Sequence, residues 1–301
     1  MSIDHRLAEW WLTNLETSAR FDAPWVADAV AWLVEASGRP GGSGPQRVLD
    51  VGCGAGGAAC AFAEAVAPGV VVGFDRDPRL LAIARRRAAD AGIAGHVLGW
   101  SCAAVDALPV EPGSADVVWA AGVVHHLPDQ QAAIGALAAL LRPGGRLVLV
   151  EGGLPVRCLP FDIGLGRVGL ESRLDEARSR WFADMRGELR GPPLPYGWPE
   201  ALRRAGLVDV QARSFLAEAP PPLDDIGRQV AERHLRSALT ELDDRLAPDD
   251  RDTVARLLDP DDAAYIGRRD DLMVTAVRTL NVGTARSGPA HRRRSPSPSV
   301  Q

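Results

Sequence analysis

The sequence predicts an α/β fold in which a doubly wound, mostly parallel sheet is covered by helices on both faces. Two observations carry this prediction. Short β-branched runs alternate with longer alanine-rich stretches of helical spacing from about residue 46 onward. The chain is also long and apolar enough, with 301 residues of which 46% are hydrophobic, to bury such a core. Apolar strands separated by helices imply right-handed crossovers and parallel pairing.

The N-terminal segment, residues 2–37, has apolar residues at helical spacing and predicts two helices. These positions are Leu7, Trp10, Trp11 and Leu15, then Trp25, Val26, Ala29, Val30 and Leu33. A run of Gly, Pro and Ser at residues 38–45 predicts a linker. Residues 1–45 are therefore expected to form a helical cap with its linker.

The core, residues 46–151, is predicted to hold five strands and three helices. In chain order these are strand 47–51, helix 57–66, strand 70–74, helix 78–91, strands 97–101 and 116–120, helix 129–141 and strand 146–150. Ligands of parallel sheets bind beyond the carboxyl ends of the strands, so the loops after these strands are the candidate site.

The pattern changes after residue 151. Residues 152–198, rich in Gly and Pro, are interpreted as an insertion on the substrate side. Residues 199–280 resume the sheet, with a helix at 199–205, a strand at 207–213, a helical insertion at 222–258 and a last strand at 271–280. Residues 281–301, which end in a basic Ser/Pro-rich stretch, are predicted to be a disordered tail.

The composition limits the kinds of partner that the protein is expected to bind. A net charge of -5 provides no general basic surface for nucleic acid. The longest apolar runs are strand-sized and the first residues do not resemble a leader, which favours a cytoplasmic protein without a membrane span. The four cysteines show no C-x-x-C spacing, so they are expected to be reduced, mostly packed thiols, and no metal is predicted.

The loop after the first strand, VLDVGCGAGG at residues 48–57, contains G-x-G-x-x-G at Gly52, Gly54 and Gly57. Taken alone, this spacing also fits a nicotinamide dinucleotide site. Asp50, however, would lie close to the pyrophosphate of a dinucleotide, where like charges repel. The loop therefore favours a cationic ligand.

Four segments together resemble the class I S-adenosylmethionine-dependent methyltransferases of the small-molecule type. They are DVGCGAG at residues 50–56, VGFDRDP at 72–78 followed by AIAR at 82–85, ALPV at 107–110 with SADVV at 114–118, and LRPGGRLVL at 141–149. The resemblance covers about a third of the chain. It implies a Rossmann-like, seven-stranded sheet whose last strand is reversed, S-adenosylmethionine as cofactor and a small-molecule methyl acceptor.

The resemblance also implies a set of cofactor-binding positions. Asp75 ends the second strand, where a carboxylate can accept two hydrogen bonds from ribose hydroxyls. Asp50 either faces the cofactor or satisfies backbone donors, and Asp77 before Pro78 is interpreted as a helix N-cap. The expected cofactor-binding residues are Asp50, Gly52, Cys53, Gly54, Gly56, Asp75, Arg76, Ala103, Ala104 and Ala121.

The adenine contact departs from the family pattern. Family members often carry an acid where this sequence has Ala104, and Asp106 stands two residues later. The contact is expected from backbone groups near Ala103 and Ala104, with Phe74 or Arg76 packing on the ring.

The catalytic candidates are His125 and His126, after the fourth strand. Neighbouring side chains in an extended loop diverge, so at most one imidazole is expected to face the substrate, where it could take a proton. The alternative is that both only fix the loop. Aromatic residues of the insertion, Phe161, Trp181, Phe182, Tyr196 and Trp198, and of the N-terminal segment, Trp10, Trp11, Phe21, Trp25 and Trp32, could wall an acceptor pocket or simply form core.

The predicted activity is methyl transfer to oxygen or carbon of a secondary metabolite or quinone-like compound. Two alternatives stay open at this point. An NAD(P)-dependent oxidoreductase would use the glycine loop and Asp75 but leaves Asp50 unexplained. A non-catalytic protein that binds S-adenosylmethionine would need no base at His125 or His126.

Overall fold

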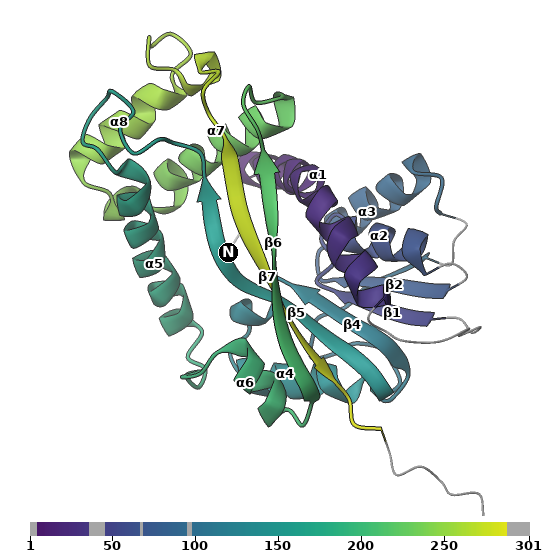
Figure 1. The fold of residues 1–301 in the computed structure, drawn as a ribbon. Helices are drawn as coiled ribbons and strands as arrows, with labels where there is room; N and C mark the ends of the chain where they lie inside the picture. Colours follow the sequence, from purple (N-terminus) through teal and green to yellow (C-terminus); the bar gives the residue numbers. More distant parts are fainter. Residues whose placement is uncertain (1–4, 36–45, 67–68, 95–97, 288–301) are drawn as a thin grey trace, which may run out of the picture.

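A seven-stranded sheet of order β3-β2-β1-β4-β5-β7-β6 organises the computed structural model, which describes residues 5–35, 46–66, 69–94 and 98–287 (Figure 1). The strands are β1 (Gln46–Val51), β2 (Gly69–Asp75), β3 (Leu98–Cys102), β4 (Ala115–Ala121), β5 (Leu141–Arg157), β6 (Val208–Ala219) and β7 (Val274–Thr284). β7 is antiparallel to both of its neighbours, and the pairs from β3 to β5 are parallel. The predicted fold class, with its reversed last strand, is confirmed.

The described part of the chain contains eight α-helices. They are α1 (His5–Glu35), α2 (Gly57–Ala65), α3 (Pro78–Asp90), α4 (Gln130–Ala139), α5 (Leu170–Glu188), α6 (Trp198–Arg204), α7 (Asp225–Glu241) and α8 (Pro248–Leu258). None of these described helices combines the length and the apolar character needed to cross a bilayer. The expected linker at 38–45 lies outside the described residues.

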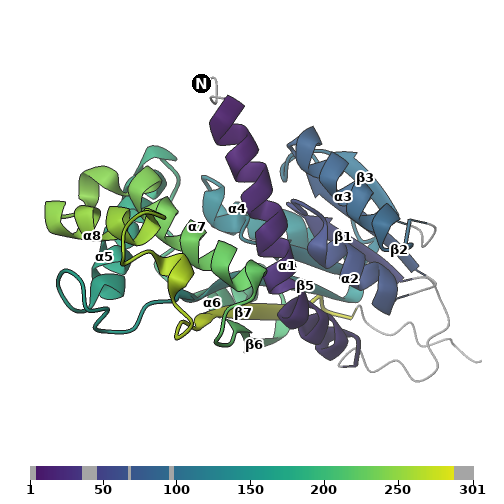
Figure 2. The ribbon, with the colours of Figure 1, turned by 90° about the horizontal axis from the view of Figure 1, so that it is seen from above.

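The prediction of two N-terminal helices was wrong, because α1 is one helix that continues through Pro24. A proline inside a helix costs about 3 kcal/mol through the lost hydrogen bond and the ring clash. The buried stripe that runs past Pro24, from Phe21 through Trp25 to Ala29, offsets that cost by packing against the sheet. Figure 2 shows α1 lying between α7 and α2.

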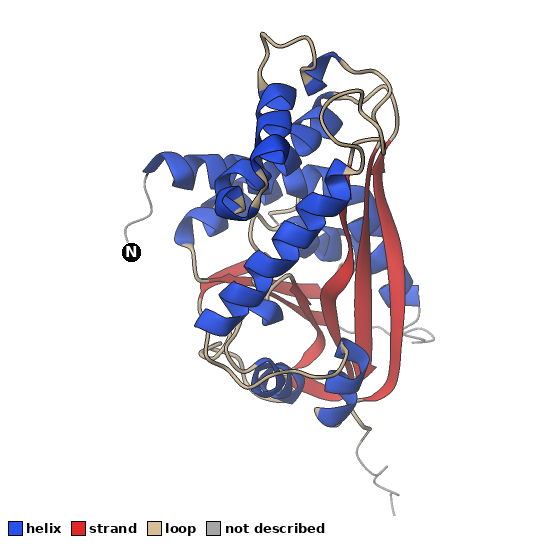
Figure 3. Ribbon diagram, turned by 90° about the vertical axis from the view of Figure 1, so that its left-hand side faces the viewer, coloured by secondary structure: helices blue, strands red, loops and turns tan. Residues whose placement is uncertain are grey.

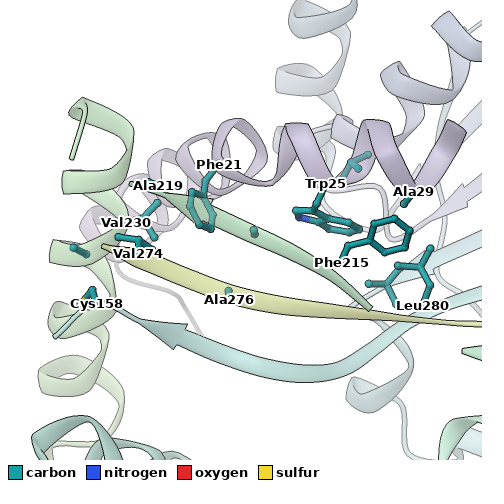
Figure 4. Close-up of a cluster of buried hydrophobic side chains, with 14 of the residues drawn as sticks. Phe21, Trp25, Ala29, Cys158, Phe215, Ala219, Val230, Val274, Ala276 and Leu280 are labelled. Atoms are coloured by element: carbon teal, nitrogen blue, oxygen red, sulfur yellow. The ribbon is translucent and has the colours of Figure 1, made fainter. Parts of the chain in front are cut away.

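Those aromatic residues of α1 whose side chains are described, Phe21, Trp25 and Trp32, pack in or against the core. The ring of Trp25 stacks on that of Trp119 in β4, with centroids 6.4 Å apart, and Trp32 packs against Phe215 in β6 at 6.2 Å. Phe21 is buried in the same cluster, which joins α1 to β6 and β7 (Figure 4). The side chains of Trp10 and Trp11 lie outside the described part.

The strands of the second half are longer than predicted. β5 continues beyond residue 150 because a bulge at Gly152 and Gly153 lets it bend and resume pairing with β7 at Gly153. β7 extends to Thr284, so the predicted tail at 281–301 starts too early: Asn281 and Val282 are buried and paired with β5 and β6. Figure 3 shows these long strands extending to the helices of the second half of the chain.

A buried carboxylate docks α5 and α7 onto the end of β5. Glu171 Oε1 accepts hydrogen bonds from the backbone N–H groups of Cys158 (2.7 Å) and Leu159 (2.9 Å), and Glu171 Oε2 lies 2.9 Å from Nε2 of His234. Burial alone would raise the pKa of Glu171, but His234 and the two amides outweigh burial and lower this pKa to about 2.

The Cys158 thiol completes this cluster, whose donor atoms all lie within 4.8 Å of one another. Burial raises the pKa of this thiol, so it remains protonated. All four cysteines are free, and three are buried, which confirms the expectation of reduced, mostly packed thiols. Hydrogen bonds satisfy the carboxylate within the cluster, and the cluster acts as a structural joint.

We expect Glu171→Gln to lower the free energy of unfolding by about 3 kcal/mol at neutral pH, since it removes the charged acceptor of a buried hydrogen-bond network. The folded pKa of about 2 lies below the ordinary 4.5, so the stabilisation is present above about pH 4.5 and is lost as the pH falls toward 2. Urea unfolding at several pH values should show the gap between wild type and variant narrowing over that interval.

The matched control is Glu176→Gln, which removes from the same helix an exposed carboxylate that forms an ion pair with Arg180. It should cost less than about 1 kcal/mol. A gap between wild type and Glu171→Gln that stays constant with pH would contradict the lowered pKa of Glu171.

Candidate active site

The glycine loop between β1 and α2 turns sharply at the carboxyl edge of the sheet. Gly52, Gly54 and Gly56 have φ of +70°, +52° and +77°, in the left-handed region that favours glycine. The backbone N–H groups of Gly52 and Cys53 both donate to the carbonyl of Phe74 at the end of β2 (2.8 and 2.9 Å). The loop is thereby fixed beside the first residues after β2.

The three positions need glycine for different reasons. A Cβ on Gly52 would lie 2.3 Å from Cγ2 of Val123, and one on Gly56 would lie 2.7 Å from Cβ of Ala84. A Cβ on Gly54 would meet no atom within 4 Å. Close packing therefore explains Gly52 and Gly56, whereas Gly54 borders open space that a ligand can fill.

Asp75 lies at the end of β2 and holds the loop that follows β1. Its Oδ2 accepts from the N–H of Gly54 and its Oδ1 from the N–H of Asp77, both at 2.9 Å. Each carboxylate oxygen can accept a second hydrogen bond, and the side chain is only partly buried. Asp77 itself accepts from the N–H of Arg79 (2.9 Å), which confirms its role as the N-cap of α3.

Asp50 is buried in the middle of the sheet, with 2% of its surface exposed. Its Oδ2 has no hydrogen-bond partner among the described residues. Burial, opposed by a hydrogen bond from the backbone of Ala59 and assisted by the charge of Asp75, raises the pKa of Asp50 to about 7. A buried carboxylate oxygen without a partner is costly, and a cationic ligand group would complete it.

Only some of the residues expected near adenine lie where a ligand could contact them. Phe74 is buried in the sheet core and cannot stack on a ligand, so that expectation was wrong. The N–H of Ala103 donates to the carbonyl of Asp75 (3.1 Å), which leaves Ala104 and Arg76 as exposed groups at this edge. Cys53 is a packed residue, and burial raises the pKa of its thiol.

The loop after β4 is built around a buried acid. Glu151, the last residue of β5 before its bulge, is 4% exposed. Its Oε1 accepts from the N–H groups of Val123 (3.0 Å) and Val124 (2.8 Å), and its Oε2 lies 2.7 Å from Nδ1 of His125. A carboxylate only accepts, so Nδ1 donates the proton, and in the neutral form of this imidazole Nε2 carries the electron pair.

The prediction that the two candidate histidines diverge was wrong, because they lie in a 3₁₀ turn and not in an extended loop, and their rings pack against each other. His125 is held by Glu151, whereas His126 is exposed at the end of the short 3₁₀ turn Val124–His126. Their ring centroids are 4.0 Å apart. The geometry thus selects His125 as the oriented imidazole. Ala121, the last residue of β4, is paired with Val150 beside Glu151 and is partly buried.

Sequence reasoning did not single out Glu151, which is 26 residues from His125 in the chain. The available signal was an acid at the carboxyl end of the strand that neighbours β4. In the fold, Asn281 of β7 also supports this point, since its Nδ2 donates to the carbonyls of Leu149 (3.4 Å) and Glu151 (3.3 Å).

A cavity of about 500 Å³ lies beside the histidine loop. Its walls come from the end of α5, the Pro-rich segment after it and the starts of α4 and α6, and they include Gln130, Phe182, Arg186, Leu194, Tyr196 and Trp198. The ring of Phe182 lies 5.7 Å from that of His125. Of the other predicted insertion aromatics, Trp181 packs against the core and Phe161 is 74% exposed.

Comparison with known proteins assigns the class. Residues 49–149 match the family described as methyltransferase domain. The chain is 39% identical over 140 residues to the demethylmenaquinone methyltransferase of Thermus thermophilus, an alignment of 46% of this chain and 59% of the relative. It is 36% identical over 117 residues to the ubiquinone biosynthesis O-methyltransferase of Bordetella bronchiseptica, with 38% of this chain and 45% of the relative aligned.

The fold agrees with these matches. The crystal structure of the YcgJ protein from Bacillus subtilis superposes with a TM-score of 0.51 and 18% identity, covering 87% of this chain and 99% of that one. Residues 49–149 carry a methyltransferase domain, and the relatives and the fold support a class I S-adenosylmethionine-dependent methyltransferase. It spans about half the length of the curated relatives it matches.

We expect Gly54→Ala to weaken binding of S-adenosylhomocysteine at least tenfold, because its Cβ enters the open space beside the loop. Its cost in folding free energy should stay near the 1–2 kcal/mol of a left-handed backbone at a non-glycine residue. Gly52→Ala adds the clash with Val123 and should destabilise the fold by more. Calorimetry and urea unfolding measure the two effects separately.

Gly113→Ala serves as the control, since Gly113 has a φ of +70° and an equally open Cβ position but precedes β4 at the opposite edge of the sheet. It should show the same strain with unchanged binding. Equal affinity in Gly54→Ala and Gly113→Ala would place the ligand elsewhere.

Proposed function

We propose that this protein transfers the methyl group of S-adenosylmethionine to a hydroxyl oxygen of a small-molecule acceptor. The observation that carries the proposal is the hydrogen bond between Nδ1 of His125 and Oε2 of Glu151. An imidazole oriented in this way by a buried acid presents Nε2 as a general base. An oxygen nucleophile needs such a base because it must lose a proton.

The cofactor is proposed to lie along the glycine loop. The uncompensated Oδ2 of Asp50 suits the cationic part of the cofactor, and the open space at Gly54 accommodates its approach to the backbone. The free acceptor sites of Asp75 suit the ribose hydroxyls. Gly52, Gly56 and Cys53 shape the loop, and Arg76, Ala103, Ala104 and Ala121 are the remaining proposed contacts.

S-adenosylmethionine supplies a methyl group already activated on a sulfonium centre, so the chain mainly has to align the acceptor and exclude water. His125 would take the hydroxyl proton at Nε2 as the oxygen becomes bonded to carbon. Glu151 would hold the ring orientation and stabilise the imidazolium that results. His126, which lacks the link to Glu151, is given no part in proton transfer.

The acceptor is proposed to be aromatic and quinone-like, or a secondary metabolite of similar shape. Phe182, Tyr196 and Trp198 line the cavity beside His125, and aromatic walls favour planar apolar ligands. The names of the two relatives above, which concern demethylmenaquinone and ubiquinone biosynthesis, point in the same direction. Methylation of carbon is the alternative.

The oxidoreductase alternative has lost its support, since the matched domain and the relatives are methyltransferases. A protein that binds the cofactor without turnover would not need Glu151 to orient His125. The arrangement therefore favours catalysis.

We expect His125→Ala to lower kcat by 10²- to 10⁴-fold while affinity for S-adenosylhomocysteine changes little, because a base acts on the acceptor and not on the cofactor. Glu151→Gln should lower kcat less than His125→Ala does, since the amide oxygen of glutamine can still accept hydrogen bonds from the N–H groups of Val123 and Val124. The assay uses S-adenosylmethionine with neutral phenols such as 2-naphthol and a naphthohydroquinone, and it detects the methyl ether by mass spectrometry.

His126→Ala is the matched control, as it removes the neighbouring imidazole without touching Glu151. Activity of His125→Ala equal to wild type would eliminate the base role. A product methylated on ring carbon would replace the oxygen assignment with the carbon alternative.

The affinity for S-adenosylhomocysteine should rise with pH between about 6 and 8. Asp50 has a pKa of about 7 in the free protein and must be ionised to pair with the ligand's ammonium, so binding below that pH releases a proton. The dependence should approach tenfold per pH unit at the acidic end. Calorimetry on Asp50→Asn should show weaker binding that no longer varies over this range; a persistent slope would assign it to another group.

A further inference from the structure

The last turn of α5 places a guanidinium on the outside of the histidine loop. Arg186 Nη1 donates to the carbonyls of His125 (2.9 Å) and Leu127 (2.7 Å), and its Nη2 donates to the carbonyl of Pro128 (3.3 Å). These three acceptors belong to one short stretch of backbone. The planar fork of arginine can serve several carbonyls at once, which the single ammonium of lysine cannot reproduce.

The residues around Arg186 contact the same stretch. Phe182, four residues earlier on α5, places its ring 5.7 Å from that of His125. Gly191, just after the helix, packs so closely on the loop that a Cβ there would lie 1.7 Å from the carbonyl oxygen of Pro128. Residues 182–191 therefore lie along residues 125–128 as one surface.

The loop needs support from this side. Glu151 binds the N–H groups of Val123 and Val124 from the inside, but the carbonyls that follow point away from it. The 3₁₀ turn Val124–His126 contains only three residues, and such turns have poor intrinsic hydrogen-bond geometry. Arg186 thus adds hydrogen bonds to carbonyls that Glu151 does not reach.

We propose that Arg186 is a positioning residue that fixes the backbone of His125 and so keeps its Nδ1 on Glu151. The inference rests on the proposed role of His125 as the base. A shift of the His125 backbone by about 1 Å would turn Nε2 away from the acceptor, and misplacement of that size costs up to about 10²-fold in rate. Arg186 also lines the cavity beside Phe182, so the insertion that shapes the acceptor side also sets the base.

The guanidinium of Arg186 binds the backbone of the histidine loop. Its described hydrogen bonds all go to backbone carbonyls, and it is the only charged residue among the cavity's lining residues in the described part of the chain. Three of its five N–H groups are bonded to the loop, so we expect its removal to leave the KM for a neutral acceptor much less affected than kcat.

The test compares Arg186→Met and Arg186→Lys with Arg180→Met, which removes an exposed guanidinium from the same helix, bonded to Glu176 and the carbonyl of Arg245. Two readouts are used. Initial rates with 2-naphthol give kcat and KM. Proton NMR follows the downfield resonance of His125 Nδ1–H, assigned among the six histidines of the chain by its loss in His125→Ala.

We expect Arg186→Met to lower kcat 10- to 100-fold with affinity for S-adenosylhomocysteine within about twofold of wild type. Its Nδ1–H resonance should broaden or disappear. Arg186→Lys should recover part of both, and Arg180→Met should match wild type. Melting curves confirm that each variant is folded.

An Arg186→Met protein that retains the resonance and the wild-type rate overturns the inference. So does a loss of rate in Arg186→Met that Arg180→Met reproduces, because the effect then comes from α5 in general. Full activity of His125→Ala would instead reject the proposed base. Where 2-naphthol is not turned over by wild type, the resonance alone decides the role of Arg186.

Discussion

The buried carboxylate of Glu151 is the interaction on which the candidate site depends. It stands where β5 bends, and it binds two backbone amides and the imidazole of the loop that follows the neighbouring strand. One group thereby fixes the position of the loop and the tautomer of His125. A buried carboxylate can only accept hydrogen bonds and has no water to bind, so it needs donors from the protein. Displacing the loop would remove those donors and would cost several kcal/mol of folding free energy.

Three buried carboxylates differ in how many hydrogen-bond partners the chain gives them. Glu151 and Glu171 each receive two backbone N–H groups and a histidine, so the chain satisfies them fully. Asp50 is equally buried, yet one of its oxygens has no partner among the described residues. The first two are held by partners within the chain, whereas the third keeps one oxygen for the cationic ligand group proposed above.

Helix α5 links the second half of the chain to the candidate site in the first half. Near its beginning, Glu171 joins the helix to the end of β5 and to α7, and near its end Arg186 binds the histidine loop. A helix of 19 residues thus connects the helical layer on the long antiparallel strands with the catalytic candidate. The glycine loop contacts the histidine loop at Val123, since a Cβ on Gly52 would lie 2.3 Å from Cγ2 of that residue.

Local patterns in the sequence determined the parallel core, because strand and helix periodicities, the glycine loop and the N-cap Asp77 depend on neighbours within a few residues. They also indicated the cofactor class through Asp50 and the candidate histidines. The tertiary structure alone decided that α1 runs unbroken through Pro24, that β7 includes Asn281, and that Phe74 is core, since each follows from packing between distant segments. It likewise selected His125 over His126: Glu151 and Arg186 are far from them in the chain, and only the pairing of β4 with β5 and the docking of α5 bring them together.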